Sequence, residues 1–419
     1  MTGQITFRAI VSDKDNWQRY QVAYAGQVTA HQIAEVEKML RCGDPTYGYA
    51  TYMCGNCGET KRVAFSCKSR VCSRCGKVHA DEWSGQVVGR MFNVTHRHIT
   101  LTVAEALWGI LERHPEWRKV LFAAANVTLR KAVRHVPGMV MVMHPYGKDL
   151  KVNYHLHVLI TEGGLDEKGR WQVQRFISYK LLRKVWQYEV LTRIREKMRE
   201  EGEAEGIIDK LFRKYRKGFY VHAEPRVKHG EGISRYIGRY IRHPAIADTR
   251  IIGYDGEEVT FYYKERREAG KKLRQIVKMP VLAFIHGVVR HIPPKQFKLV
   301  RYYGLYAPRT ANKVKETLLR IGRMMGRKVK RLSWRGRMKK QFGKDPLQCP
   351  RCGEGEMDLF SLTLPWRGKM VTIGGWEWFL DSIMTSRPPP VGVELAIGEG
   401  IQLELDFTVQ GRWVQLSLI

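Results

Sequence analysis

The stretch GMVMVMHPYGKDLKVNYHLHVLIT, residues 138–161, decides the fold of this chain. Its two ends, residues 138–143 and 154–161, are apolar and contain β-branched side chains, as buried strands do. The segment between them is polar and rich in turn-forming residues, so we predict that the two strands form an antiparallel hairpin. Residues 98–103, HITLTV, have the same character and predict another buried strand.

The second strand of this hairpin carries the first candidate site, His155-Leu156-His157. Residues i and i+2 of a strand point to the same face, so the two imidazoles project side by side and Leu156 faces the opposite layer. Such a pair can clamp a metal ion and leave positions on the ion open. Taken alone, the triplet equally fits two surface histidines or the first ligand pair of a metallohydrolase, but no convincing further ligand set follows for the latter.

Beyond the hairpin, most of the periodicity is helical, and residues 1–30 contain no strong motif. An Asp255-Gly256 turn within residues 250–264 predicts a second hairpin. Helices are predicted over residues 31–41, 104–135 with a break near Pro115, 176–201, 231–242 and 281–345. The last residues alternate as a strand does, so the chain as a whole is predicted to be α+β.

The helix predicted over residues 231–242 carries the second candidate site, Tyr236-Ile237-Gly238-Arg239-Tyr240. Residues i and i+4 of a helix lie one above the other, so the two phenols are neighbours. Arg235, Arg239 and Arg242 flank them and are candidate phosphate ligands. Alone, a pair of tyrosines on an amphipathic helix usually indicates packing.

The eight cysteines are clustered, with six between residues 42 and 75 and a Cys349-Pro-Arg-Cys352 pair near the end. Two CxxC pairs, Cys54–Cys57 and Cys72–Cys75, predict a tetrahedral zinc site made of four thiolates. Two further thiols, Cys42 and Cys67, are either buried or join His31 or His79 in a second zinc site. A set of Cys67, Cys72, Cys75 and His79 is equally compatible with the spacing. The Cys349–Cys352 pair is interpreted as half of a zinc ribbon, a degenerate knuckle without an obvious second half.

The charge of the chain indicates a polyanionic partner. Its 419 residues include 72 Lys and Arg against 41 Asp and Glu, for a net charge of +31. Nucleic acid is the expected partner for such a surface, and Arg331, Trp334 and Arg335 in the basic run 311–340 are candidate DNA contacts. A membrane span and a secretion signal are not expected, so we predict a cytoplasmic, nucleoid-associated protein. A Walker motif is absent, so ATP hydrolysis is not expected.

Together the two sites make a chemical proposal. A tyrosine hydroxyl beside a divalent cation that polarises a phosphate can attack in line and displace a 3′-hydroxyl. The phosphotyrosine product preserves the energy of the broken bond, and a second tyrosine one turn away can take a second strand. The combination therefore favours strand cleavage and transfer over hydrolysis.

The order of these motifs resembles the HUH single-strand endonucleases, which include the Rep nucleases and Helitrons. More closely, the chain resembles the two-tyrosine rolling-circle transposases of the insertion sequence 91 family. The similarity spans roughly residues 35–355, and these stretches carry it: FSCKSRVCSRCG (65–76), VMVMHPYGKDLKVNYHLHVLITEGG (140–164), YIGRYIRHPAIADTRI (236–251), YDGEEVTFYYK (254–264), HIPPKQFKLVRYYGLYA (291–307) and CPRCG (349–353).

The resemblance implies that Tyr236 and Tyr240 are nucleophiles and that His155 and His157 bind Mg²⁺ or Mn²⁺. HUH sites usually take a third polar ligand, for which hairpin geometry favours His144 over Asp149. The implied core is an antiparallel sheet with flanking helices, as in RRM or ferredoxin-like folds. The implied partners are single-stranded DNA of transposon ends and target sites, a DNA hairpin, and a host helicase or replication machinery.

The expected organisation has five parts: an N-terminal segment (1–34), a zinc-binding domain (35–90), an HUH endonuclease domain (91–270), a basic helical DNA-binding region (271–345) and a C-terminal CxxC knuckle with a β-rich tail (346–419). The main alternative function is a rolling-circle replication initiator, which shares the chemistry. An alternative of another class is a non-catalytic zinc-ribbon regulator that binds nucleic acid without forming a covalent product.

Overall fold

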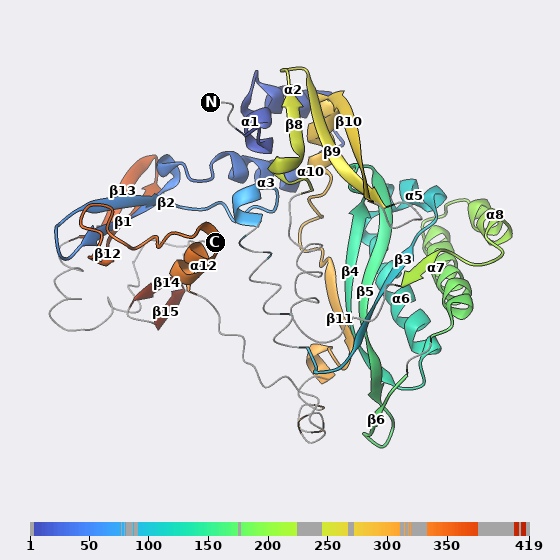
Figure 1. Cartoon of the computed structure of the whole chain (residues 1–419). Coiled ribbons are helices and arrows are strands. Elements are labelled where there is room, and N and C mark those ends of the chain that lie inside the picture. The colour runs from blue at the N-terminus through green and yellow to red at the C-terminus, as the bar shows by residue number, and fades with distance from the viewer. Residues whose placement is uncertain are drawn as a thin grey trace. The chain divides into compact units, whose positions relative to one another are not determined.

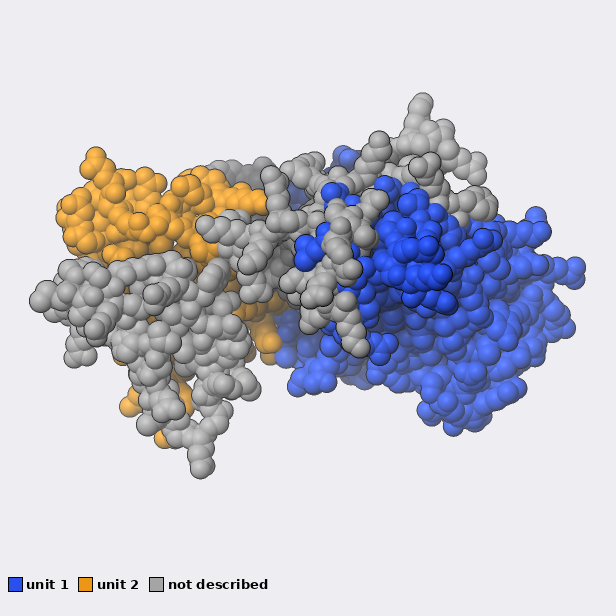
Figure 2. All heavy atoms as spheres, turned by 90° about the horizontal axis from the view of Figure 1, so that it is seen from below, with its two compact units in different colours: residues 1–36, 79–329 blue, residues 37–78, 330–419 orange. Residues whose placement is uncertain are grey.

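The computed structural model describes most of the chain and divides it into two compact units (Figures 1 and 2). The first unit comprises residues 1–36 and 79–329, and the second comprises residues 37–78 and 330–419. The described residues are 4–76, 78, 80, 87, 91–174, 177–223, 245–266, 272–310, 314, 317, 319, 333–375, 406–409 and 412–415. Several predicted site residues lie outside them: His79, Arg235, Tyr236, Arg239, Tyr240, Arg242 and Arg331.

The first unit is built on an antiparallel sheet with the strand order β11-β4-β5-β3-β7, and β6 pairs with β5. Its strands are β3 (His96–Thr102), β4 (Val136–Tyr146), β5 (Val152–Leu165), β6 (Trp171–Gln172), β7 (Val221–Ala223) and β11 (Val300–Gly304). The predicted hairpin is confirmed, since β4 and β5 pair from Val136↔Leu165 to Tyr146↔Val152. The structure therefore confirms the α+β fold class with antiparallel sheets.

One face of this sheet is covered by helices and forms the main core (Figure 1). Alternation along β5 sends Tyr154, Leu156 and Val158 to this face, where each is completely buried. The covering elements are η2 (Glu105–Leu107), α5 (Trp108–Arg113), η3 (Pro115–Arg118), α6 (Lys119–Ala132), α7 (Tyr179–Glu200) and α8 (Gly206–Lys214). The predicted helix break at Pro115 is confirmed, because a 3₁₀ turn separates α5 from α6 there.

The opposite face of the sheet carries a smaller apolar cluster and, beyond it, polar side chains. Val140, Val142 and Leu159 pack there with Phe92 and Tyr306. The Tyr306 hydroxyl lies 2.7 Å from His96 Nε2. Nearer the β4–β5 turn, the same face carries His144, His155 and His157, which form the candidate site.

The remaining part of the first unit joins the N-terminus to a second sheet. Asn16 donates a hydrogen bond of 2.8 Å to the Tyr254 hydroxyl, and the Phe7 ring packs edge-on against Phe284. The elements are α1 (Phe7–Ser12), α2 (Asn16–Ala23), α3 (Ala30–Leu40), η4 (Asp248–Arg250), β8 (Ile251–Tyr254), β9 (Glu258–Arg266), β10 (Lys272–Pro280) and α10 (Val281–Val289). The β8–β9 hairpin confirms the Asp255-Gly256 turn.

Two sequence predictions need correction in this unit. Residues 1–30 showed no strong motif, yet they form two short helices held by tertiary contacts to β8 and α10. The continuous helical pattern predicted for 281–345 is wrong in part, because helix α10 ends at Val289 and β11 extends the central sheet. The sequence of β11, VRYYG, is rich in side chains that favour strands.

The second unit is a four-stranded antiparallel sheet with the order β13-β12-β1-β2. Its two central strands, β1 and β12, pair with each other although they come from the N-terminal and C-terminal parts of the chain. The other edge of β1 pairs with β2. The elements are η1 (Pro45–Tyr47), β1 (Tyr49–Cys54), β2 (Thr60–Ala64), α12 (Trp334–Phe342), β12 (Met357–Trp366), β13 (Lys369–Gly374), β14 (Asp406–Val409) and β15 (Arg412–Gln415). The cysteine-rich segment 37–78 and the C-terminal segment 330–419 therefore lie in one compact unit.

None of the helices in the described part of the chain is long and apolar enough to cross a lipid bilayer.

Candidate active site and metal centres

Three histidines converge on the polar face of the central sheet. His144 on β4 lies directly opposite His155 on β5, and His157 follows on the same face. The ring centroids of His144 lie 5.3 Å from those of His155 and 4.6 Å from those of His157. One ligand atom from each of the three lies within 4.8 Å of the others.

The separation between the ligand nitrogens of the three histidines fits a shared metal ion after small side-chain rotations. Nitrogen ligands about 2.1 Å from one ion lie roughly 3–3.5 Å apart. Asp149, the alternative third ligand, instead accepts a hydrogen bond of 3.2 Å from the Lys151 amide in the β4–β5 turn. Within the described residues, the cluster therefore consists of His144, His155 and His157.

Hydrogen bonds behind the cluster orient two of its rings. His155 Nδ1 lies 2.6 Å from the Asn153 carbonyl oxygen and donates to it, which leaves Nε2 for a ligand role. His157 Nδ1 lies 2.8 Å from His98 Nε2 and 3.3 Å from Thr100 Oγ1 on β3. His98 was not predicted as a site residue; residues 98–103 were predicted as a strand, but only the pairing of β3 with β5 places His98 beside His157.

The electrostatic setting favours the neutral form of His155, His157 and His98. Burial lowers the pKa of His155, and burial together with the neighbouring imidazoles and Lys148 lowers the pKa of His157 well below its usual value. Burial also lowers the pKa of His98 to about 4. Neutral imidazole is the form that binds metal ions.

The eight cysteines form two clusters, and the division differs from the predicted one. The predicted set of Cys54, Cys57, Cys72 and Cys75 is wrong because its two CxxC pairs belong to different clusters. The first cluster contains Cys42, Cys67, Cys72 and Cys75, and the second contains Cys54, Cys57, Cys349 and Cys352.

The first cluster lies where the chain leaves α3 and where it leaves β2. Cys42 Sγ lies 3.7 Å from the sulfurs of both Cys72 and Cys75, and Cys67 Sγ lies 3.7 Å from that of Cys75. Four thiolates 2.3 Å from a zinc ion sit about 3.8 Å apart at the corners of a tetrahedron, so the geometry fits zinc. None of the four forms a disulfide, and the sulfur–sulfur distances exceed a disulfide bond of about 2.05 Å.

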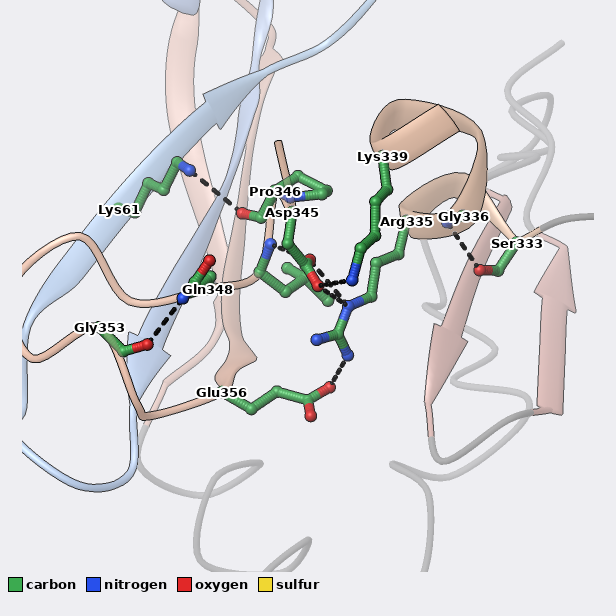
Figure 3. A network of polar contacts seen from close by, with 11 residues as sticks. Lys61, Ser333, Arg335, Gly336, Lys339, Asp345, Pro346, Gln348, Gly353 and Glu356 are labelled. Atoms are coloured by element: carbon green, nitrogen blue, oxygen red, sulfur yellow. Dashed lines mark hydrogen bonds and ion pairs between the residues drawn. The ribbon is translucent and has the colours of Figure 1, made fainter. Parts of the chain in front are cut away.

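The predicted DNA contacts that the structure describes, Arg335 and Trp334, have partners inside the second unit, and Figure 3 shows those of Arg335. Arg335 Nε donates to both carboxylate oxygens of Asp345, at 2.8 and 3.0 Å, and its Nη1 pairs with Glu356. The Trp334 ring stacks on Tyr52 with a centroid distance of 6.2 Å and an interplanar angle of 7°. The structure therefore gives both side chains a role in packing.

Comparison with known proteins finds two family models that match this chain. A family model described as "Putative transposase" matches residues 138–314, which include the histidine hairpin. A second model, described as a transposase zinc-binding domain, matches residues 13–103, which include six of the cysteines. This match and the cysteine clusters identify structural zinc as a component of the protein.

Two curated relatives extend over most of the chain. The transposase for insertion sequence element IS801 of Pseudomonas savastanoi pv. phaseolicola is 27% identical over 338 residues, which cover 77% of this chain and 82% of the relative. The "Putative transposase y4qJ" of Sinorhizobium fredii is 26% identical over 377 residues, which cover 82% and 93%. No solved structure matches the chain. The two family models and these relatives together support an insertion sequence 91 family transposase.

Proposed function

We propose that this transposase nicks and joins single-stranded DNA at transposon ends through 5′-phosphotyrosine intermediates. The observation that carries the proposal is the convergence of His144, His155 and His157 on one face of the sheet. Tyr236 and Tyr240 are the proposed nucleophiles, and both lie outside the described residues.

The described residues on either side of the tyrosine segment support its approach to the histidines. Before it, β7 pairs with β3, and His222 lies opposite Thr100, which lies opposite His157 on β5. After it, the Arg250 guanidinium donates a hydrogen bond of 2.6 Å to the Lys148 carbonyl in the β4–β5 turn. The described residues before the segment therefore lie on β7, which β3 separates from β5, and Arg250 after it contacts the β4–β5 turn.

The chemistry follows from these groups. A tyrosine oxygen attacks the phosphorus, a new O–P bond forms, and the bond to the 3′ oxygen breaks. The tyrosine proton passes to solvent and the 3′ oxygen takes up a proton. A divalent cation held by the three imidazoles would supply charge stabilisation at the phosphate.

The donor set bears on which cation is used. Mg²⁺ prefers oxygen ligands and near-ideal octahedral geometry, so the three imidazoles that the described residues supply fit a first-row transition metal such as Mn²⁺ better than Mg²⁺. We therefore propose Mn²⁺ as the preferred metal, with Mg²⁺ as the weaker alternative. Phosphate contacts from the basic surface would supply affinity for the strand that decreases with salt.

The test of the function is a labelled single strand from a transposon end, incubated with the full chain and Mn²⁺. We expect a band on a denaturing gel that carries protein and is removed by protease, and we expect EDTA to prevent it. Replacing His155 or His157 by alanine should lower the yield of the covalent adduct by more than about 100-fold. This exceeds the loss of about 10–100-fold that follows when a residue that only orients a metal ligand is removed. DNA binding in a filter assay should stay within a few-fold of wild type.

His31→Ala is the matched control, because His31 lies on α3 and outside the described histidine and cysteine clusters. It should leave the adduct unchanged. A metal-independent adduct, or a full yield from the His155 and His157 variants, would remove the histidine cluster from the reaction. Binding without any covalent product would instead favour a non-catalytic regulator.

A further prediction concerns His98, which we assign as a positioning residue that accepts from His157 Nδ1. Its replacement by alanine should raise the Mn²⁺ concentration needed for half-maximal nicking by about 10–100-fold, because the His157 ring loses its orientation. His98→Gln keeps a hydrogen-bond acceptor and should recover part of the loss. An unchanged Mn²⁺ requirement in His98→Ala, with only lower thermal stability, would show that His98 only packs the sheet.

A further inference from the structure

We propose that Cys54, Cys57, Cys349 and Cys352 form a second zinc site, which joins the two ends of the chain into one zinc ribbon. The transposase zinc-binding model covers residues 13–103 and so includes only half of this site. The inference does not rest on the proposed DNA chemistry.

The sulfur geometry carries the first step. Cys54 Sγ lies 3.8 Å from Cys352 Sγ, and Cys57 Sγ lies 3.6 Å from Cys349 Sγ. All four sulfurs lie within 4.8 Å of one another. The two measured distances match the edge of about 3.8 Å expected for a zinc ion with four thiolates at 2.3 Å. Cys54 and Cys349 are buried and all four thiols are free, so a closed structural site fits better than a reactive one.

The main chain builds two matching knuckles around these sulfurs. In the first, the Gly58 amide donates to the Cys54 carbonyl at 2.9 Å. In the second, the Gly353 amide donates to the Cys349 carbonyl at 3.1 Å, and the Gly355 amide lies 3.3 Å from Cys352 Sγ and donates to it. A side chain at position 355 would collide with Cys54 Sγ, so glycine permits the close approach.

The strand register explains why the knuckles meet. The first knuckle forms the turn between β1 and β2, and the second immediately precedes β12. Because Cys54 at the end of β1 pairs with Met357 at the start of β12, both knuckles lie at the same end of the sheet. Met357 is buried against Cys54 and Cys349.

Ion pairs connect the basic helix α12 to the residues that flank the second knuckle (Figure 3). Arg335 on α12 binds Asp345 and Glu356, which lie on either side of the second knuckle in sequence. Lys339 adds an ion pair of 3.6 Å with Asp345. Lys61 on β2 donates a hydrogen bond of 3.1 Å to the Pro346 carbonyl oxygen. Loss of zinc from this site should therefore loosen α12 together with the knuckle.

The test is the zinc content of the purified full chain, measured by elemental mass spectrometry. We expect two zinc ions per wild-type chain, and one in the double variant Cys349→Ser, Cys352→Ser. The matched double variant Cys54→Ser, Cys57→Ser should also retain one, and His31→Ala should retain two. Two zinc ions in the Cys349 and Cys352 variant, or a single ion in wild type, would overturn the proposal.

A second measurement on the wild type covers the case in which a variant does not fold. Zinc-loaded protein is treated with iodoacetamide and the alkylated cysteines are mapped by peptide mass. We expect Cys349 and Cys352 to be protected together with Cys54 and Cys57, and all four to become reactive when a chelator removes the metal. Alkylation of Cys349 and Cys352 at full zinc occupancy, with Cys54 and Cys57 still protected, would refute a shared site.

Discussion

Phenylalanine at both Tyr236 and Tyr240 should abolish the covalent protein–DNA adduct, by at least about 10⁴-fold, because removal of a covalent nucleophile leaves only the residual effects of binding. The change removes one oxygen from each ring and keeps the apolar volume, so packing is little disturbed. Each single variant should keep part of the adduct, since the other phenol can still attack. The measurement is the yield of the protease-sensitive band on a denaturing gel with Mn²⁺.

Tyr188→Phe is the matched control for this prediction. Tyr188 is exposed on α7, on the helical side of the sheet, away from the face that carries His155 and His157. It should leave the adduct yield unchanged. An undiminished adduct in the double variant would rule out Tyr236 and Tyr240 as nucleophiles, whereas loss of binding in that variant would assign them to DNA contact or to packing.

The second large effect concerns both cysteine clusters. Removing zinc with a chelator should unfold the second unit while the first stays folded. Structural zinc contributes about 10–16 kcal/mol in small zinc domains, as much as or more than the roughly 5–15 kcal/mol of stability of a typical domain. The second unit has an apolar cluster of Cys54, Cys349 and Met357, whereas the first has a large core around Leu156 and Trp186.

Hydrogen exchange read by peptide mass measures this difference. Peptides from β1 and β12 should lose their protection after zinc removal, while peptides from β4 and β5 should keep it. His31→Ala again serves as the control that retains zinc. Unchanged protection of β1 and β12 in protein shown to be free of zinc would mean that apolar packing alone holds the second unit together.

Much of the histidine site could be predicted from local sequence. The alternation of residues 154–161 defines which side chains share a face, and the polar segment between residues 143 and 154 defines the hairpin. His144 followed from the hairpin, because opposite residues of paired strands are neighbours. His98 could not be found in this way, since it lies on a strand from another part of the chain and its contact with His157 depends on the order of strands in the sheet.

Local patterns in the sequence are enough to predict the α+β class, the β4–β5 hairpin, the shared face of His155 and His157, and the knuckle character of each CxxC pair, because all of these depend on residues a few positions apart. Which knuckles lie together depends on the tertiary fold. Adjacency in the sequence favoured Cys54 and Cys57 with Cys72 and Cys75, yet β12 pairs with β1 and brings to them Cys349 and Cys352, with Cys352 298 positions after Cys54. Strand pairing between distant segments is set by the burial of whole sheet faces, and the spacing of cysteines carries no record of it.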